Sequence, residues 1–259
     1  GVKPFYYACE KGRFAFASEI KQLLAVPWVG AEANRARLAD FFLWGLETHT
    51  DETFFAGVKS LPASHYVILT RENLALGRIE PQRYWTPAPV GALGERQAIE
   101  AFRDLLSDSV RLRLRSDVPV GVTLSGGLDS SSVVCLAGEH RRAGREDSPL
   151  DAFNVEFEGT RYSERQFAEA AAGKAGARTV VLRPSQEDLA REWARFVWHM
   201  EEPFGSLSYF SNFQIYRLIR AHGISVVLSG QGGDELLLGY ERYRIYNLLF
   251  SLQAFRPWA

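Results

Sequence analysis

Four short apolar runs in the C-terminal part of the chain constrain its fold more than any other feature. Each is rich in β-branched or aromatic residues, and they lie at residues 118–124, 152–157, 178–184 and 224–229. Helical segments separate them, and a further helix is predicted ahead of them at 97–112. Apolar strands that alternate with helices form a parallel sheet that is covered on both faces. We therefore predict an α/β fold, a parallel sheet flanked by helices.

Local signals predict where three of these helices start or stop. Ser163 and Gln166 have the spacing of a capping box ahead of an alanine-rich segment. Ser185 is a candidate N-cap of the next helix, and Gly223 is a candidate residue just beyond the helix that follows.

The first part of the chain has a different pattern. Residues 5–19 alternate as a β-hairpin does, with Lys11 and Gly12 at the turn. The proline-rich stretch at residues 83–95 is typical of a linker. We therefore predict two domains, residues 1–90 and 91–259. Because the sequence starts without methionine and ends in an apolar segment, we expect it to be a fragment of a longer protein.

Net charge, the length of apolar runs and the cysteine content bear on which partners and which location we expect. The net charge of −1 over 259 residues gives no electrostatic reason to expect a nucleic-acid or membrane partner. No apolar run is long enough to span a bilayer. The two cysteines, Cys9 and Cys135, lie in unlike contexts, which argues against a disulfide and favours a cytoplasmic location.

The strongest functional motif is SGGLDSS, residues 125–131, which we name the first glycine turn. It follows the 118–124 run and opens a helix predicted at 130–140, at the edge of the sheet where ligands bind in parallel α/β folds. Backbone N–H groups freed by glycine, hydroxyl groups and a helix N-terminus form a cradle for phosphate; the residues concerned are Ser125, Gly126, Gly127, Ser130 and Ser131.

Asp129 distinguishes this turn from other phosphate loops. A carboxylate in a phosphate cradle is repulsive unless a cation intervenes, so Asp129 is predicted to hold Mg²⁺ against phosphate oxygens. The turn has no lysine, which excludes a Walker loop, and no G-x-G-x-x-G pattern, which excludes a dinucleotide fingerprint.

A second glycine turn, residues 229–234, repeats this design. SGQGGD follows the 224–229 run, and Asp234 and Glu235 open the next helix. If both strands end at the same edge of one sheet, Asp129 and Asp234 face each other and form a two-carboxylate magnesium site. Acidic residues also complement the dipole of a helix start, which is the alternative for Glu235 and, less strongly, for Asp234.

These motifs resemble a known family. SGGLDSS looks like the pyrophosphatase loop of the ATP-pyrophosphatase superfamily. LSGQGGDELLLGY, together with GVKPFYY, FASEIKQLL, ETFFAGVKSLPASHYVIL and RYW, is similar to glutamine-dependent asparagine synthetases. The resemblance implies that residues 1–90 are a small β-rich remnant of an N-terminal nucleophile glutaminase domain. It implies that residues 91–259 are a truncated ATP-pyrophosphatase synthetase domain.

The resemblance also implies a reaction. ATP adenylates a carboxylate, with aspartate as the leading candidate, pyrophosphate leaves, and ammonia derived from glutamine displaces AMP. The implied cofactors are ATP and Mg²⁺, with pyrophosphate on residues 125–131 and Mg²⁺ on Asp129 and Asp234. The implied adenosine contacts are Leu124, Val155, Ser229 and Gly230. The catalytic candidates are Asp129, Gln231, Asp234 and Glu235.

Departures from the family pattern keep alternatives open. The glutaminase nucleophile, an N-terminal cysteine, is not at the start of this chain, and Cys9 inside a predicted strand is no substitute. Gln231 stands where some family members have a glutamate base, and an amide cannot take up a proton. A β-lactam or lasso-peptide-type cyclase with the same adenylation step, and a non-catalytic nucleotide-binding fragment, are the alternatives. Glu202 lies in a loop that could reach the acceptor, and the sequence leaves a homodimer open.

Overall fold

Two compact units make up the structure, a computed structural model that describes residues 3–10, 12–88, 91, 93–144, 149–160 and 163–254. The N-terminal unit comprises Gly1–Ala92 and Ala190–Tyr209, and the C-terminal unit comprises Leu93–Leu189 and Phe210–Ala259. From the sequence we predict that residues 190–209 belong to the second domain, whereas in the structure this segment packs with the first part of the chain. The division into a glutaminase remnant and a synthetase domain stays a prediction.

The C-terminal unit contains a four-stranded parallel sheet in the order β8-β7-β6-β9. All four predicted strands are confirmed, at β6 (Val120–Thr123), β7 (Leu150–Val155), β8 (Ala177–Leu182) and β9 (Val226–Leu228). Val122 is paired with Ala152 on one side and with Leu228 on the other. The strand that leads into the first glycine turn is therefore central and adjoins the strand that leads into the second.

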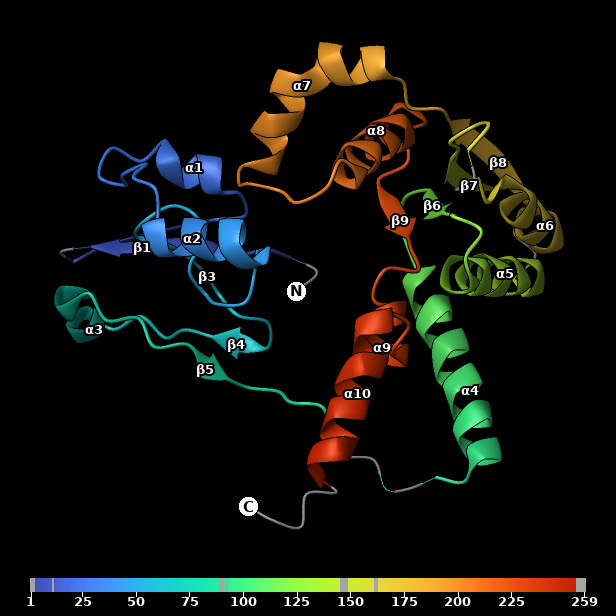
Figure 1. The fold of residues 1–259 in the computed structure, drawn as a ribbon, viewed down its shortest axis with the longest axis horizontal. Coiled ribbons are helices and arrows are strands. Elements are labelled where there is room, and N and C mark those ends of the chain that lie inside the picture. The colour runs from blue at the N-terminus through green and yellow to red at the C-terminus, as the bar shows by residue number, and fades with distance from the viewer. Residues whose placement is uncertain are drawn as a thin grey trace. The chain divides into compact units, whose positions relative to one another are not determined.

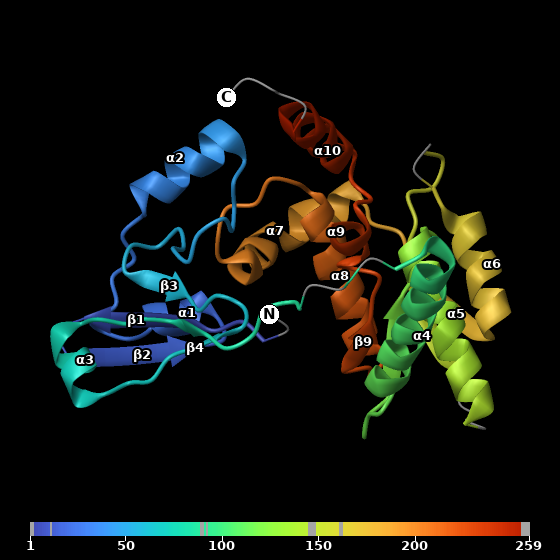
Figure 2. The same cartoon turned by 90° about the horizontal axis from the view of Figure 1, so that it is seen from below.

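Helices cover both faces of this sheet, which confirms the predicted α/β fold (Figures 1 and 2). The elements are α4 (Glu95–Arg113), α5 (Leu128–Ala143), α6 (Arg165–Ala175) and α8 (Ser208–Ala221). One face is sealed by α4, α5 and α6, with Val134 and Ala172 in the buried cluster. On the other face, Ile215 and Ile219 of α8 pack against Phe153. The C-terminal unit ends with α9 (Gly233–Leu237) and α10 (Glu241–Ala254).

Two of the three predicted helix signals are confirmed. Helix α7 (Gln186–Met200) begins after Ser185, whose hydroxyl accepts the Asp188 N–H at 3.0 Å. The Asp188 carboxylate accepts the Ser185 N–H in return, at 3.3 Å. Gly223 follows α8 with a φ of +75°, the left-handed conformation in which glycine carries no steric cost.

The capping box at Ser163 is wrong. Helix α6 starts after Glu164, which makes no side-chain capping hydrogen bond. The Ser163 N–H donates to Thr160 O at 3.2 Å, so this residue closes the preceding turn and the helix begins too late for Ser163 to be its N-cap.

The N-terminal unit is built on an antiparallel sheet in the order β2-β1-β3. The predicted hairpin is confirmed by β1 (Tyr6–Glu10) and β2 (Arg13–Ala17), with Gly12 at a φ of +78°, while Lys11 lies outside the described residues. Helix α1 (Ile20–Leu24) packs on this sheet through a buried cluster of Ile20, Leu23 and Val58. The other elements are α2 (Arg35–Trp44), β3 (Val58–Ser60), β4 (His65–Tyr66), α3 (Arg71–Leu76) and β5 (Gln82–Arg83).

Three findings bear on the remaining expectations. Pro89, Val90 and Ala92 of the predicted linker lie outside the described residues, as do residues 255–259 of the apolar end. Cys9 and Cys135 are both free thiols. Within the described ranges, no helix combines the length and the apolar character that crossing a membrane requires.

Candidate nucleotide-binding site

The first glycine turn joins the central strand β6 to α5. The helix starts behind Gly127, which provides no side-chain cap, and Gly126 has a φ of +101°. Gly126 also needs to be glycine because a Cβ there would lie 2.7 Å from Glu164 O. The Gly127 N–H donates to Ser125 Oγ at 3.2 Å. This turn therefore approaches α6 closely and leaves the start of α5 without a side-chain cap.

Ser130 holds the turn together from inside. Its side chain is buried, and its hydroxyl accepts the Ser125 N–H at 3.2 Å and lies 2.9 Å from Ser125 Oγ. It also lies 3.3 Å from Gly127 O, to which it can donate. By contrast, the half-buried Ser131 hydroxyl has no hydrogen-bond partner among the described residues. The Ser130 hydroxyl is therefore used within the turn, whereas the Ser131 hydroxyl is not.

The second glycine turn uses the same local device. The Ser229 hydroxyl accepts the Gln231 N–H at 3.3 Å, as Ser125 does for Gly127. Helix α9 starts behind Gly232, which has a φ of +97° and provides no side-chain cap. Asp234 therefore occupies the same position in the first turn of α9 as Asp129 does in α5.

The two turns touch each other. A Cβ on Gly230 would lie 2.7 Å from Ser130 N and 2.9 Å from Asp129 Cβ. A Cβ on Gly233 would overlap the Asp129 carboxylate. Since β6 and β9 are parallel neighbours, their carboxyl ends lie at one edge, as predicted. The carboxylate of Asp129 consequently lies against the residue that precedes Asp234.

The two aspartate carboxylates each lie against a glycine, Gly233 for Asp129 and Gly239 for Asp234. The Asp234 carboxylate lies beside Gly239, where a Cβ would overlap it. That Asp129 and Asp234 face each other across a metal stays a prediction. Among the described residues, no group of three or more His, Cys, Asp or Glu side chains could hold a metal ion. Asp129 and Asp234 are the carboxylates at this edge that could contribute oxygen donors to a metal. The Asp129 carboxylate fits against the second turn because Gly230 and Gly233 have no Cβ that would collide with it.

The other predicted contacts surround the same edge. Leu124 is buried immediately after β6, and Val155 is half-buried at the end of β7. Gln231 is exposed on the second glycine turn. Glu235 is also exposed and accepts a hydrogen bond from the Tyr240 hydroxyl at 3.3 Å. The roles of these residues stay predictions.

Two side chains behind the turns escaped the sequence analysis. Asn154 is buried in β7, and its amide Nδ2 donates to Leu124 O at 2.7 Å. Thr123 of β6 donates from its hydroxyl to Leu228 O at 3.5 Å. The signal that could have revealed Asn154 is a polar residue in the middle of the apolar run at 152–157.

A different set of carboxylates organises the N-terminal unit. Glu201 accepts the Ile20 N–H at 2.9 Å and the Lys21 N–H at 2.8 Å. Glu202 accepts the Phe54 N–H at 2.7 Å. Burial raises the pKa of the Glu202 carboxyl, an effect that the Phe54 N–H partly offsets. Glu202 therefore uses its carboxylate within the N-terminal unit, anchoring the segment 190–209 to the first part of the chain.

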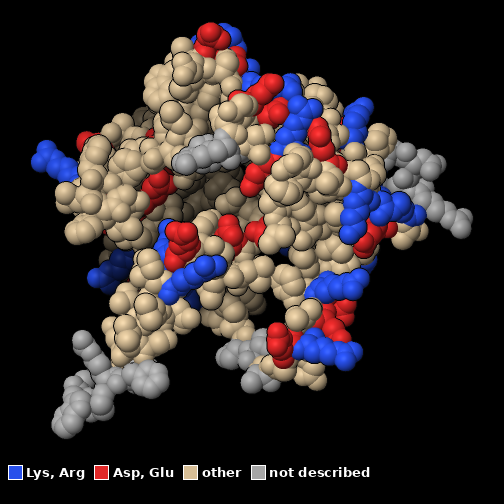
Figure 3. All heavy atoms as spheres, turned by 45° about the vertical axis from the view of Figure 1, so that its right-hand side comes forward, with Lys and Arg blue, Asp and Glu red and all other residues tan. Residues whose placement is uncertain are grey.

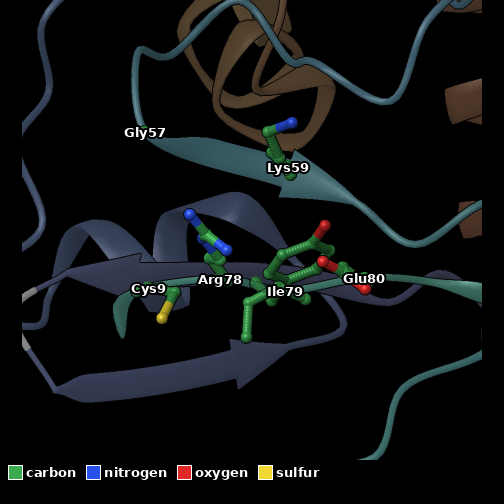
Figure 4. A pocket seen from close by; sticks show the side chains of 8 residues that line it. Cys9, Gly57, Lys59, Arg78, Ile79 and Glu80 are labelled. Carbon is green, nitrogen blue, oxygen red and sulfur yellow. The ribbon is translucent and has the colours of Figure 1, made fainter. Parts of the chain in front are cut away.

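The N-terminal unit also contains a cavity of about 400 Å³ (Figure 4). Its lining includes Cys9, Lys59, Arg78 and Glu80. Burial raises the pKa of the Cys9 thiol, which is opposite to what a nucleophilic thiolate needs. That Cys9 does not replace the family's glutaminase nucleophile stays a prediction.

On the face drawn in Figure 3, acidic and basic side chains are interspersed. The net charge of −1 is in keeping with this mixture.

Two family models match this chain, one in its first part and one in its second. The sequence model of the asparagine synthase family matches residues 101–256, and that of the glutamine amidotransferase domain matches residues 1–85. A putative glutamine-hydrolyzing asparagine synthetase 2 of Methanocaldococcus jannaschii is 33% identical over 93% of this chain and 45% of its own length. Asparagine synthetase 1 of Bacillus subtilis is 31% identical over 94% of this chain and 37% of its own length. Amidase chyE of Penicillium rubens is 32% identical, also over 94% of this chain and 37% of its own length.

Proposed function

Because this chain belongs to the asparagine synthase family, we propose that its C-terminal unit is the ATP-binding part of an ATP-dependent amide-forming ligase. The chain spans 37% to 45% of the length of the three relatives compared, so the activity of the whole protein is part of this proposal. The reaction we assign is adenylation of a carboxylate, with aspartate as the first candidate, followed by transfer of ammonia derived from glutamine.

The contact between the two glycine turns carries this proposal. Gly230 and Gly233 bring the second turn so close to Asp129 that no side chain fits between them. Two uncapped helix starts, each with an aspartate in its first turn, thus lie at one sheet edge. Backbone N–H groups at such an edge favour the anionic oxygens of a phosphate chain.

The first step breaks the bond between the α- and β-phosphates of ATP. A carboxylate oxygen of the substrate attacks the α-phosphorus, an acyl-adenylate forms, and pyrophosphate leaves with the bonding electron pair. The first glycine turn receives the departing pyrophosphate, through the N–H groups at the start of α5 and the free hydroxyl of Ser131. Leu124, Val155, Ser229 and Gly230 would lie around the adenosine.

Asp129 and Asp234 would hold Mg²⁺, which when bound neutralises charge on the phosphate oxygens. Carboxylate oxygens are the donors that this ion prefers. The role of the protein here is to place two carboxylates beside an N–H-lined cradle, so that most of the catalytic effect comes from positioning and electrostatics.

The second step is attack by ammonia on the acyl carbon, with AMP as the leaving group. The nitrogen then sheds a proton, which the neutral amide of Gln231 cannot take up. We assign Gln231 to hydrogen bonding of the acceptor and Glu235, in the first turn of α9, to uptake of the proton.

The test is product analysis with the full-length protein. ATP should give AMP and pyrophosphate only when a carboxylate substrate is present, and formation of ADP would contradict the proposal. Asp129→Asn should lower pyrophosphate release on the order of 100-fold or more. Glu139→Gln removes one carboxylate from the exposed surface of the same helix and should leave the rate unchanged.

Gln231 favours a second candidate, a cyclase that uses the same adenylation but an internal amine. Pyrophosphate release with aspartate, compared with a panel of peptide and β-amino acid carboxylates, separates the two reactions. Binding of ATP without turnover on any of these carboxylates would favour the third reading, a nucleotide-binding fragment.

A further inference from the structure

A buried amide lies directly behind the first glycine turn. Asn154 is 2% exposed, in a strand whose neighbouring residues Ala152 and Phe153 are fully or almost fully buried. Its Oδ1 atom has no hydrogen-bond partner among the described residues. An unsatisfied buried acceptor costs free energy, and an aliphatic side chain at this position would avoid that cost. The position therefore needs an explanation beyond packing.

The amide nitrogen of Asn154 holds the backbone at the start of the first glycine turn. Asn154 Nδ2 donates at 2.7 Å to the carbonyl oxygen of Leu124, the residue immediately before the first glycine turn. The Leu124 N–H is held by Phe153 O at 2.8 Å, so both backbone groups of Leu124 are bound from β7. The peptide plane that leads into Ser125 is thereby fixed.

The same device recurs one strand further along the sheet. Thr123 Oγ1 donates to Leu228 O, the carbonyl immediately before the second glycine turn, at the longer distance of 3.5 Å. Because the strand order is β7-β6-β9, each side chain reaches the end of the neighbouring strand. Side chains from two adjacent strands thus hold the carbonyls ahead of both turns.

The first glycine turn is closely packed on both sides, so it cannot shift to compensate for a rotated Leu124 peptide. Gly126 is packed against α6, where a Cβ would lie 2.7 Å from Glu164 O. On its other side, the first turn meets Gly230, where a Cβ would lie 2.7 Å from Ser130 N. A rotation of the Leu124 peptide would therefore redirect the N–H groups of the turn.

We propose that Asn154 is a positioning residue for the nucleotide site, acting through the Leu124 carbonyl on the direction of the N–H groups in the first glycine turn. This inference rests on the proposed function. Asn154 need not touch ATP; its amide sets the geometry that the phosphates meet.

The decisive variant is Asn154→Leu, whose side chain has the same branched skeleton of heavy atoms but neither amide polar atom. Because it loses one hydrogen bond but also the unsatisfied oxygen, its thermal midpoint should stay close to that of the wild type. Its dissociation constant for ATP with Mg²⁺, measured by calorimetry on the full-length protein, should rise at least about fivefold. Binding of inorganic pyrophosphate should weaken in the same proportion.

Gln214→Leu is the matched control. Gln214 of α8 is also buried, and its Oε1 also lacks a partner among the described residues. Its replacement should leave ATP binding within about twofold of the wild type. Equal losses of binding in both variants, in step with their thermal midpoints, would overturn the inference in favour of a structural role.

Two further variants keep the outcomes distinct. Should Asn154→Leu fail to fold, Asn154→Ser, whose side chain is one bond shorter, must weaken ATP binding, and unchanged binding would overturn the inference. Asp129→Asn tests the underlying function. If it leaves ATP binding intact, the proposed function fails; if it abolishes binding while Asn154→Leu does not, only the role of Asn154 fails.

Discussion

In the N-terminal unit the N–H groups at the start of α1 are bound by a carboxylate of the same chain, whereas in the C-terminal unit the starts of α5 and α9 have no side-chain cap. Glu201 reaches Ile20 and Lys21 from a position 181 residues away from Ile20. Gly127 and Gly232 occupy the corresponding cap positions in the other unit and provide no side chain.

The difference shows how one chemical group serves two purposes. Backbone N–H donors at a helix start attract negative charge. Where the chain supplies the charge itself, as with Glu201, the donors fasten one segment to another. Where it does not, as at the glycine turns, we propose that the donors receive an external anion and that Asn154 fixes their direction through the Leu124 carbonyl.

The largest effect should come from a side chain placed where the two glycine turns touch. In Gly233→Ala the new Cβ would overlap the Asp129 carboxylate and force the turns apart. We expect carboxylate-dependent pyrophosphate release to fall on the order of 100-fold or more. Gly173→Ala is the control, because a Cβ there meets nothing within 4 Å, and it should leave activity intact. Retained activity in Gly233→Ala would mean that the turns need not touch.

Removing the internal cap should be the next largest effect. Glu201→Ala leaves two N–H groups of α1 and the Lys21 ammonium, 3.2 Å from the carboxylate, without this partner. We expect the free energy of unfolding to fall by about 2 kcal/mol, measured by urea denaturation. Glu19→Ala removes a more exposed carboxylate near the same Lys21 and should cost no more than about 0.5 kcal/mol. Equal effects of the two variants would argue against Glu201 as the anchor.

The two serines of the first glycine turn differ in the same way as the two units do, because Ser130 binds the turn from within and the Ser131 hydroxyl has no partner among the described residues. Ser130→Ala leaves the Ser125 N–H without its partner, so it should cost about 1 kcal/mol of stability. Ser131→Ala removes a hydroxyl that has no hydrogen-bond partner in the described part of the chain, so stability should change by less than about 0.5 kcal/mol while the KM for ATP rises several-fold. Paired denaturation and kinetic measurements check both statements, and a reversed pattern would contradict them.

The smallest effect concerns pH. Burial raises the pKa of Glu202, Glu201 and Glu47 raise it further, and the Phe54 N–H and Arg37 lower it. The folded state therefore holds this proton more tightly than the unfolded chain does. The stability contributed by Glu202 is complete below the ordinary carboxyl pKa and is lost as the pH rises through the raised value.

Glu202→Gln should remove that part of the pH dependence. The amide oxygen can still accept the Phe54 N–H, so the change at any one pH should stay within about 1 kcal/mol. Urea denaturation from about pH 4 to about pH 7 gives the slope. Glu72→Gln, at an exposed position in α3, is the control, and an unchanged slope in Glu202→Gln would contradict the assignment.

Much of the C-terminal fold was predictable because its signals are local. Each strand is a short apolar run and the strand-turn-helix of residues 118–140 is written in consecutive residues. The touching of the turns followed from parallel pairing of β6 and β9. The strand order itself depends on contacts between distant segments, which no local pattern encodes.

Two features of the molecule could not be read from local patterns. Glu201 and Glu202 precede a proline and look like loop residues, yet their hydrogen-bond partners lie far away in the sequence. Asn154 was visible as a polar residue in an apolar run, but its effect depends on the carbonyl of Leu124, 30 positions earlier. Both depend on tertiary geometry.

The placement of residues 190–209 has a consequence for how this protein can be taken apart. The family model for asparagine synthase matches residues 101–256 as one stretch, but the chain leaves the C-terminal unit after Leu189 and returns to it at Phe210. Because the chain passes between the two units three times, neither unit is a single continuous segment. A single cut in the linker releases neither of them whole, and recombination at that linker would exchange an N-terminal unit without the segment that Glu201 and Glu202 anchor to it. A recombination event that replaces the N-terminal unit therefore has to replace residues 1–92 and 190–209 together.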